Sequence, residues 1–143
     1  MPNKVLVIYG SRRVGKTTLL NDLLKNSGLN YRIDNGDNVR TMEIFDSNDL
    51  EVLRRYSEGY DLIAIDEAQE IPNIGKGLKI LIDNFSDLKL IATGSSSFDL
   101  SGQIGEPLTG RKRVIKLFPF SQGELLELYT TYEIQQRLND FLV

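Results

Sequence analysis

The sequence contains neither cysteine nor histidine, and these two absences exclude many familiar catalytic chemistries. Without cysteine, the chain has no disulfides and no thiolate metal site, which is typical of proteins from a reducing compartment. Without histidine, it has no imidazole base, no imidazole metal ligand and no Ser-His-Asp triad. Any catalysis must therefore depend on carboxylates, Lys, Arg, hydroxyl groups, backbone amides or a metal ion.

The sequence also has no large excess of positive or negative charge and no long apolar segment. The net charge is −3, which argues neither for nor against nucleic acid as a partner of the whole surface. No apolar run approaches the ~20 residues needed to cross a bilayer, and the first residues lack the apolar stretch of a signal peptide. These features predict a cytoplasmic protein without membrane contact. The 143 residues fit one domain, 1–143.

Apolar periodicity predicts strands that alternate with helices. Short, continuous apolar runs indicate buried strands at 4–9, 60–65, 88–93 and 113–117, with a shorter strand at 31–34. Helices are expected at 15–25, at 47–56 with Asp46 or Ser47 as the cap, at 76–85, and from Ser121, with a break near Thr130. This alternation predicts an α/β fold with a parallel sheet.

A phosphate-binding loop is predicted between the first strand and the first helix. Residues 10–17, GSRRVGKT, match the pattern G-x-x-x-x-G-K-[ST] in full. The glycines let the backbone curl so that its N–H groups point at phosphate oxygens. Lys16 is expected to reach the β- and γ-phosphates, and the Thr17 hydroxyl is expected to bind Mg²⁺. The predicted nucleotide-binding residues are Gly10, Ser11, Arg12, Arg13, Val14, Gly15, Lys16, Thr17 and Thr18.

Two alternatives stay open for this loop. A glycine-containing turn before a surface helix would show part of the same pattern, although the full match between a strand and a helix argues against it. Arg12 and Arg13 occupy variable positions of the pattern. They either add positive charge near the phosphates or lie in solvent, as charged loop residues commonly do.

Two adjacent carboxylates follow the apolar strand at 60–65. Asp66 is suited to hold Mg²⁺ through water, because Mg²⁺ prefers oxygen ligands and keeps several waters. Glu67 is suited to act as the general base that activates water at the γ-phosphate. The alternative is a pair of solvated acids. ATP is expected rather than GTP, because the one Asn-Lys pair, Asn3-Lys4, lacks the Asp of a guanine reader and precedes the loop.

Five sequence blocks together resemble the prokaryotic AAA+-like ATPases of the "AAA domain 14" type. The blocks are residues 10–20, 65–69, 93–97, 108–111 and 117–121 with Glu124, and the similarity extends over about residues 3–127. The resemblance implies a P-loop NTPase fold of the additional-strand type, with a parallel sheet of order 5-1-4-3-2 flanked by helices. It also implies a polar sensor, with Ser95 as the first candidate and Thr93 as the second, although a Ser-rich turn is the alternative.

The resemblance further marks Arg111, which follows Gly110, as a candidate arginine finger. We expect Arg111 to complete the site of a neighbouring subunit in a homo-oligomer. The alternatives are that Arg111 pairs with a nearby acid such as Glu106, or that it belongs to the basic edge cluster with Lys112 and Arg113. Members of the family usually continue into a long C-terminal region, so 121–143 are expected to be terminal helices of a truncated protein. No helical lid with a second sensor arginine is visible after Glu124.

The leading prediction is therefore Mg-dependent ATP binding and hydrolysis by a module that drives or switches a missing output domain. One alternative is a nucleotide-sensing scaffold that does not hydrolyse ATP. A small-molecule kinase is less favoured, because no acceptor pocket or Arg-rich lid is evident. DNA binding through Arg111, Lys112, Arg113 and Lys116 is also less favoured, because exposed charge commonly protects an edge strand.

Overall fold

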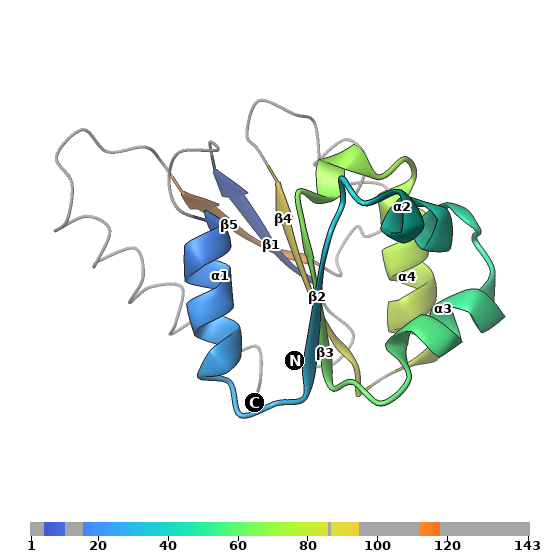
Figure 1. Ribbon diagram of the computed structural model, residues 1–143, viewed down its shortest axis with the longest axis horizontal. Helices are drawn as coiled ribbons and strands as arrows, with labels where there is room; N and C mark the ends of the chain where they lie inside the picture. The colour runs from blue at the N-terminus through green and yellow to red at the C-terminus, as the bar shows by residue number, and fades with distance from the viewer. Residues whose placement is uncertain (1–4, 11–15, 86, 95–111, 118–143) are drawn as a thin grey trace, which may run out of the picture.

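The computed structural model describes residues 5–10, 16–85, 87–94 and 112–117 (Figure 1). Within these residues the chain forms parallel strands, α-helices and one short 3₁₀ helix. In chain order they are β1 (Val5–Gly10), α1 (Lys16–Lys25), β2 (Tyr31–Asn35), α2 (Val39–Asp46), α3 (Leu50–Ser57), β3 (Leu62–Asp66), η1 (Ala68–Glu70), α4 (Ile74–Asn84), β4 (Lys89–Gly94) and β5 (Lys112–Leu117).

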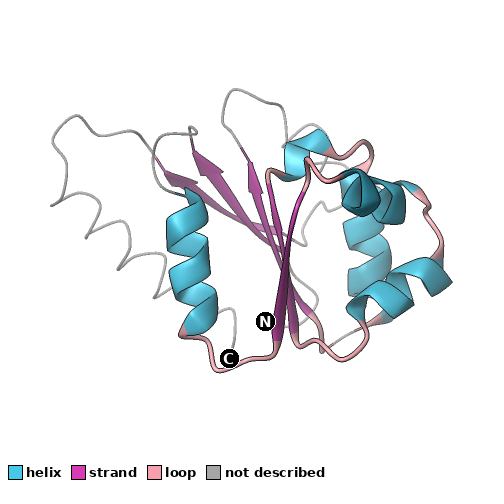
Figure 2. Ribbon diagram, in the orientation of Figure 1, coloured by secondary structure: helices cyan, strands magenta, loops and turns pink. Residues whose placement is uncertain are grey.

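The sheet confirms the expected topology. Its strand order is β2-β3-β4-β1-β5, and every neighbouring pair is parallel. Read from the opposite edge, this is the order 5-1-4-3-2. The strand β5 pairs with β1 alone among the described residues, so it is an edge strand as the sequence predicted. Because all strands run the same way, the C-terminal ends of β1, β3 and β4 lie together along the edge of the sheet at which the strands end (Figure 2).

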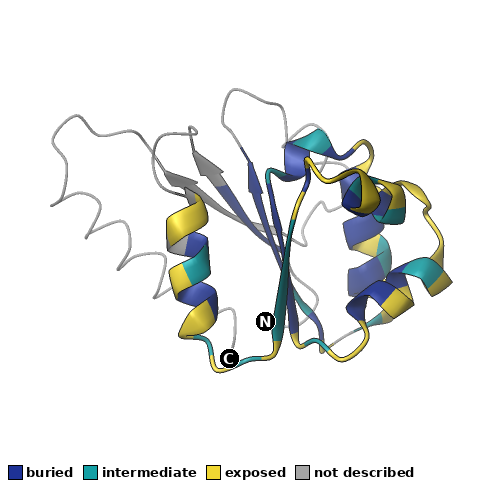
Figure 3. Ribbon diagram, in the orientation of Figure 1, coloured by how far each residue is buried: buried dark blue, intermediate teal, exposed yellow. Residues whose placement is uncertain are grey.

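Helices cover both faces of the sheet, which explains the continuous apolar runs in the sequence. The helix α1 lies on one face, and α2, α3 and α4 lie on the other (Figure 1). Alternate strand residues then face two different cores, so Leu6 packs with α1 residues while Val7 packs on the opposite side. Residues 5–8 of β1, all of β3 and all but the first residue of β4 are consequently buried, whereas the edge strand β2 is mostly half-buried (Figure 3).

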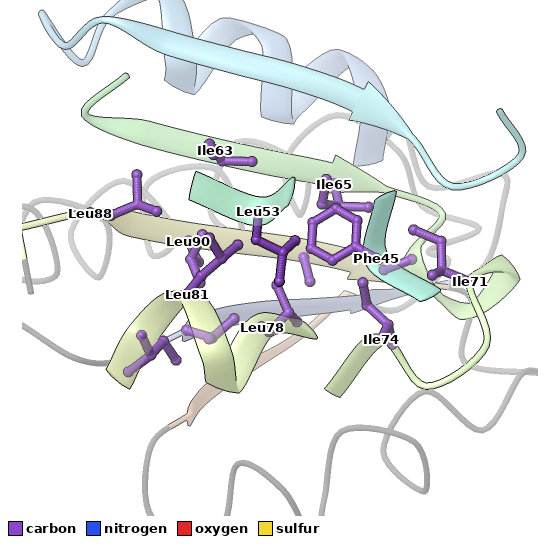
Figure 4. Packing of buried hydrophobic residues seen from close by; sticks show 14 of the residues in the cluster. Phe45, Leu53, Ile63, Ile65, Ile71, Ile74, Leu78, Leu81, Leu88 and Leu90 are labelled. Carbon is purple, nitrogen blue, oxygen red and sulfur yellow. The ribbon is translucent and has the colours of Figure 1, made fainter. Parts of the chain in front are cut away.

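The larger core lies beneath α2, α3 and α4. Phe45 of α2 and Leu53 of α3 are fully buried and lie near Ile65 and Leu78 (Figure 4). Phe45 also meets the ring of Tyr56 edge-on, with centroids 5.4 Å apart. This packing fixes the helical layer against β3, the strand that carries the paired acids.

The expected helix at 47–56 was wrong in its beginning and its cap. Asp46 is the last residue of α2, and α3 begins only at Leu50. Asp49 caps α3, because its Oδ1 accepts hydrogen bonds from the N–H groups of Glu51 (2.8 Å) and Val52 (3.4 Å). Asn48 has a left-handed φ of 51°, which interrupts the helical path between the two helices.

The helix α2 was not predicted at all. Residues 35–38 are of types common in turns, so the sequence indicated a turn there rather than the start of a helix. Asn38 is in fact the cap of α2, and its Oδ1 accepts hydrogen bonds from the N–H groups of Arg40 (2.9 Å) and Thr41 (3.3 Å). The remaining predicted strands and helices within the described residues agree with the structure to within about two residues. The predicted helices from Ser121 onward lie outside the described residues.

A polar cluster joins the edge strand β2 to α3. The Tyr56 hydroxyl donates to Asp34 Oδ2 at 2.5 Å, and Arg32 Nε donates to the same oxygen at 2.7 Å. The Arg32 guanidinium also lies over the Tyr56 ring, 4.2 Å from its centroid. Burial raises the pKa of Tyr56, and the hydrogen bond to Asp34 raises it further, so the phenol keeps the proton that it donates.

Replacing Tyr56 with Phe should lower the free energy of unfolding by about 1.5 kcal/mol, because the hydrogen bond removed ends on a charged acceptor. Urea denaturation of the two proteins measures the difference. Tyr60→Phe is the matched control, because Tyr60 also lies near Arg32 but its hydroxyl makes no hydrogen bond within the described part of the chain. Equal losses in both variants would contradict this role for the hydroxyl.

Candidate functional site

The first feature of the site is a direct contact between α1 and the end of β3. The Thr17 hydroxyl donates to Asp66 Oδ2 at 2.7 Å, although the two residues are 49 positions apart. Thr17 lies in the first turn of α1 and is exposed, whereas Asp66 is the last residue of β3 and is 3% exposed. The fold therefore brings together the two residues that the sequence assigned to Mg²⁺.

The other oxygen of Asp66 is held by β4. The Thr93 hydroxyl donates to Asp66 Oδ1 at 2.5 Å, and the Glu67 N–H lies 3.2 Å from the same oxygen and from the Thr93 hydroxyl. Thr93 is completely buried. Asp66 thus accepts hydrogen bonds on both oxygens, which fixes the plane of its carboxylate before any ligand arrives.

Glu67 has an unusual backbone conformation. Its φ of 53° and ψ of 46° lie in the left-handed region, which costs a non-glycine residue about 1–3 kcal/mol and is often found at functional positions. The left-handed residue reverses the chain between β3 and η1. The Gln69 side-chain amide donates to Glu67 Oε2 at 2.6 Å, so the carboxylate is held from the turn that follows it.

The turn after β2 contacts the backbone of Asp66 and Glu67. The Gly36 N–H donates to the Asp66 carbonyl oxygen at 2.7 Å. A β-carbon at position 36 would lie 2.2 Å from the Glu67 carbonyl oxygen, which is far inside van der Waals contact. Only glycine fits here without displacing Glu67. Sequence reasoning missed both Gly36 and Gln69, and the close spacing of Gln69 to Glu67 was the one signal available.

The oxygen atoms of Thr17 and Asp66 fit a magnesium ion chemically. Mg²⁺ takes oxygen ligands, keeps several waters and usually binds through one or two carboxylates together with substrate phosphates. Among the described residues, no group of three or more His, Cys, Asp and Glu side chains could enclose a metal by itself. A hydroxyl beside one oriented carboxylate is instead compatible with a metal whose other ligands are waters and a phosphate.

The family model described as an AAA domain matches residues 2–126. The chain belongs to the AAA domain family. Uncharacterized protein MJ1544 of Methanocaldococcus jannaschii is 30% identical over 140 residues, which are 96% of this chain and 31% of that protein. Uncharacterized protein Rv2008c of Mycobacterium tuberculosis is 32% identical over 114 residues, 79% of this chain and 24% of that protein. The chain thus spans no more than about a third of these relatives.

Membership in the family gives the AAA domain a nucleotide-binding, ATPase-like character. The edge of the sheet described above agrees with this character, because it combines the N-terminus of α1 with an oriented carboxylate. The described part of the AAA domain also contains no helix that is both long enough and apolar enough to cross a membrane.

The remaining predicted site residues are placed only in part. Gly10 ends β1 and Lys16 begins α1, so they flank the predicted phosphate-binding loop. Thr18 is exposed on α1. The predicted loop residues Ser11, Arg12, Arg13, Val14 and Gly15, the sensor candidate Ser95 and the arginine-finger candidate Arg111 lie outside the described residues. Of the two sensor candidates, Thr93 contacts Asp66 directly.

Replacing Gly36 with Ala should lower the free energy of unfolding by about 1–3 kcal/mol, because the added methyl group overpacks against backbone. It should also shift the amide NMR signals of Glu67 and Ala68. Gly28→Ala is the control, because the φ of 74° at this position would strain an alanine, whereas an added β-carbon would meet no atom within 4 Å. That control should lose stability without moving the signals of Glu67. An unchanged site and unchanged stability in Gly36→Ala would contradict the close approach.

Proposed function

We propose that this AAA domain binds ATP together with Mg²⁺ and hydrolyses the γ-phosphate at the edge where β1, β3 and β4 end. The observation that carries the proposal is the 2.7 Å hydrogen bond between the Thr17 hydroxyl and the buried Asp66. Two oxygen atoms that could bind a metal, one from α1 and one from β3, lie side by side there. The strained Glu67 follows Asp66 immediately.

The N-terminal end of α1 supplies the phosphate-binding part of the proposal. The first N–H groups of a helix have no partner within the helix, so together with the helix dipole they favour negative charge, and Lys16 adds a full positive charge at the first helical position. Thr17 and Asp66 would hold the metal, whose charge offsets that of the phosphates when it is bound. Thr93 keeps Asp66 oriented through the hydrogen bond to Oδ1.

Glu67 supplies the proton acceptor. A water oxygen attacks the γ-phosphorus while the water proton passes to the Glu67 carboxylate, the bond to the β-phosphate oxygen breaks, and ADP and phosphate leave. The left-handed backbone and the bond from Gln69 restrict the positions open to this carboxylate. ATP is favoured over GTP because the sequence lacks the Asn-Lys-x-Asp guanine reader.

We also propose that hydrolysis drives or switches a larger protein. The matched part makes up only 31% and 24% of the relatives MJ1544 and Rv2008c, so in them the matching segment belongs to a much longer chain. The role of Arg111 in a neighbouring subunit stays a prediction. It would add positive charge to the transferred phosphoryl group.

Phosphate release from ATP tests the proposal. With Mg²⁺ and no other acceptor present, the chain should release phosphate from ATP and release much less from GTP at the same concentration. Chelation of the metal should stop the reaction. ATP that binds tightly but stays intact would contradict hydrolysis and support a nucleotide-sensing scaffold. Turnover that appears only with an added acceptor molecule would support a kinase.

A further inference from the structure

The side chain of Gln69 has no part in the proposed chemistry, yet it is 3% exposed and lies against the proposed base. Its Nε2 donates to Glu67 Oε2 at 2.6 Å. An ionised Glu accepts hydrogen bonds only, so the amide nitrogen rather than the amide oxygen must face it. This buried amide donates to one carboxylate oxygen of Glu67, whereas an amide in solvent would hydrogen-bond to water instead.

We propose that Gln69 is a positioning residue for hydrolysis, which holds the Glu67 carboxylate where it can take a proton from the attacking water. This inference rests on the proposed function, since it assigns a support to the proposed base. The hydrogen bond from Gln69 Nε2 ends on Oε2, and hydrogen bonding of a water to Oε1 would be compatible with this contact.

The rigidity of the turn makes this support effective. Glu67 and Gln69 belong to one tight segment, in which the Glu70 N–H donates to the Glu67 carbonyl at 3.1 Å and the Ile71 N–H donates to the Ala68 carbonyl at 3.1 Å. Ala68 and Ile71 are fully buried in the larger core. The donor is thus carried by a fixed backbone rather than by a surface loop.

The backbone of Glu67 is fixed as well. Its N–H is held by Asp66 and Thr93, and its carbonyl is covered by Gly36. With the backbone held, the side-chain torsions of Glu67 decide where its carboxylate lies. A hydrogen bond to Gln69 restricts these torsions before the reaction, which lowers the entropy lost when the reacting groups align.

Gln69→Met tests the inference, because methionine has nearly the same size and shape but no amide donor. The variant should turn over Mg-ATP about 10- to 100-fold more slowly, which is the usual effect of removing a group that orients a reacting side chain. Its affinity for Mg-ATP should be unchanged, so the loss should appear in kcat. Gln69→Glu, which is equal in size but repels Glu67, should lose at least as much and serves if the Met variant does not fold.

A double-mutant cycle separates positioning from a general structural effect. If Gln69 acts through the Glu67 carboxylate, Gln69→Met should cause little further loss in a Glu67→Gln background. An equal loss in both backgrounds would overturn the inference, because Gln69 would then act elsewhere. Faster turnover in Gln69→Met would also overturn it, because Gln69 would then restrain the base.

The same cycle keeps this inference distinct from the proposed function. If Glu67→Gln is slow while Gln69→Met turns over like the parent chain, the base stands and the positioning role fails. If Glu67→Gln itself turns over like the parent, the proposed base fails and the positioning role fails with it. Parent protein that never hydrolyses Mg-ATP would overturn both.

Discussion

Replacing Glu67 with Gln should slow ATP hydrolysis by ~10²–10⁴-fold, the usual contribution of a general base. Glutamine keeps the size of the side chain and can still accept the hydrogen bond from Gln69 through its amide oxygen. It has no basic carboxylate, so it cannot take the proton of the attacking water. Binding of Mg-ATP should remain as tight as in the parent chain, because Asp66 and Thr17 keep their contact.

Phosphate release and calorimetric ATP binding together measure this effect. Glu43→Gln makes the same chemical change on the exposed surface of α2 and should hydrolyse ATP at the parent rate. If Glu67→Gln hydrolyses ATP as fast as Glu43→Gln, another group activates the water. If Glu67→Gln loses ATP binding instead, the carboxylate supports the ligand rather than the reaction.

The second large effect concerns affinity. Lys16→Ala should weaken ATP binding roughly 10- to 150-fold, since a hydrogen bond between charged groups contributes about 1.5–3 kcal/mol. Lys16 is the first residue of α1, at the end of the helix where the dipole also favours phosphate. The loss should therefore be largest for nucleotides that carry β- and γ-phosphates and small for AMP.

Lys25→Ala is the matched control for this prediction. Lys25 lies in the last turn of the same helix and is exposed, so its removal takes away one positive charge at the opposite end. Calorimetry should find unchanged ATP affinity for that variant. An Lys16→Ala protein that is folded by circular dichroism and binds ATP as tightly as the parent would contradict the phosphate-binding role.

The sheet was predictable from sequence because its signals are local and strong. Continuous apolar runs such as 62–65 indicate strands buried on both faces, and alternation with helices makes them parallel. Parallel strands end at one edge, so a loop after β1 and acids at the end of β3 are expected to lie close together. The contact between Thr17 and Asp66 follows from this geometry.

The supports of the site were not predictable in the same way. The left-handed backbone of Glu67 runs against the preference of its residue type, so no local pattern indicates it. The contact of Gly36 with Asp66 and Glu67 depends on how the turn after β2 packs across the sheet edge. The boundary between α2 and α3 was missed because four polar residues, 46–49, follow one another, and the last of them, Asp49, is the true cap.

Thr93 illustrates how packing assigns a contact to a polar residue that the sequence names only as a candidate. The sequence offered Ser95 and Thr93 as sensors at the end of one strand. Thr93 is completely buried and its hydroxyl joins Asp66 to the Glu67 backbone. Such a residue orients the proposed metal ligand and the proposed base together. The sensor role of Ser95 stays a prediction, because Ser95 lies outside the described residues.

The most direct test of the central claim is to identify the nucleotide that remains bound after one turnover. The chain is mixed in excess over radiolabelled ATP, with Mg²⁺ or with a chelator, and the products are separated over time. Hydrolysis at the site of Thr17, Asp66 and Glu67 predicts conversion of bound ATP to ADP and phosphate with Mg²⁺, and intact ATP with the chelator. ATP that stays intact in both samples, or is cleaved equally in both, would contradict the claim.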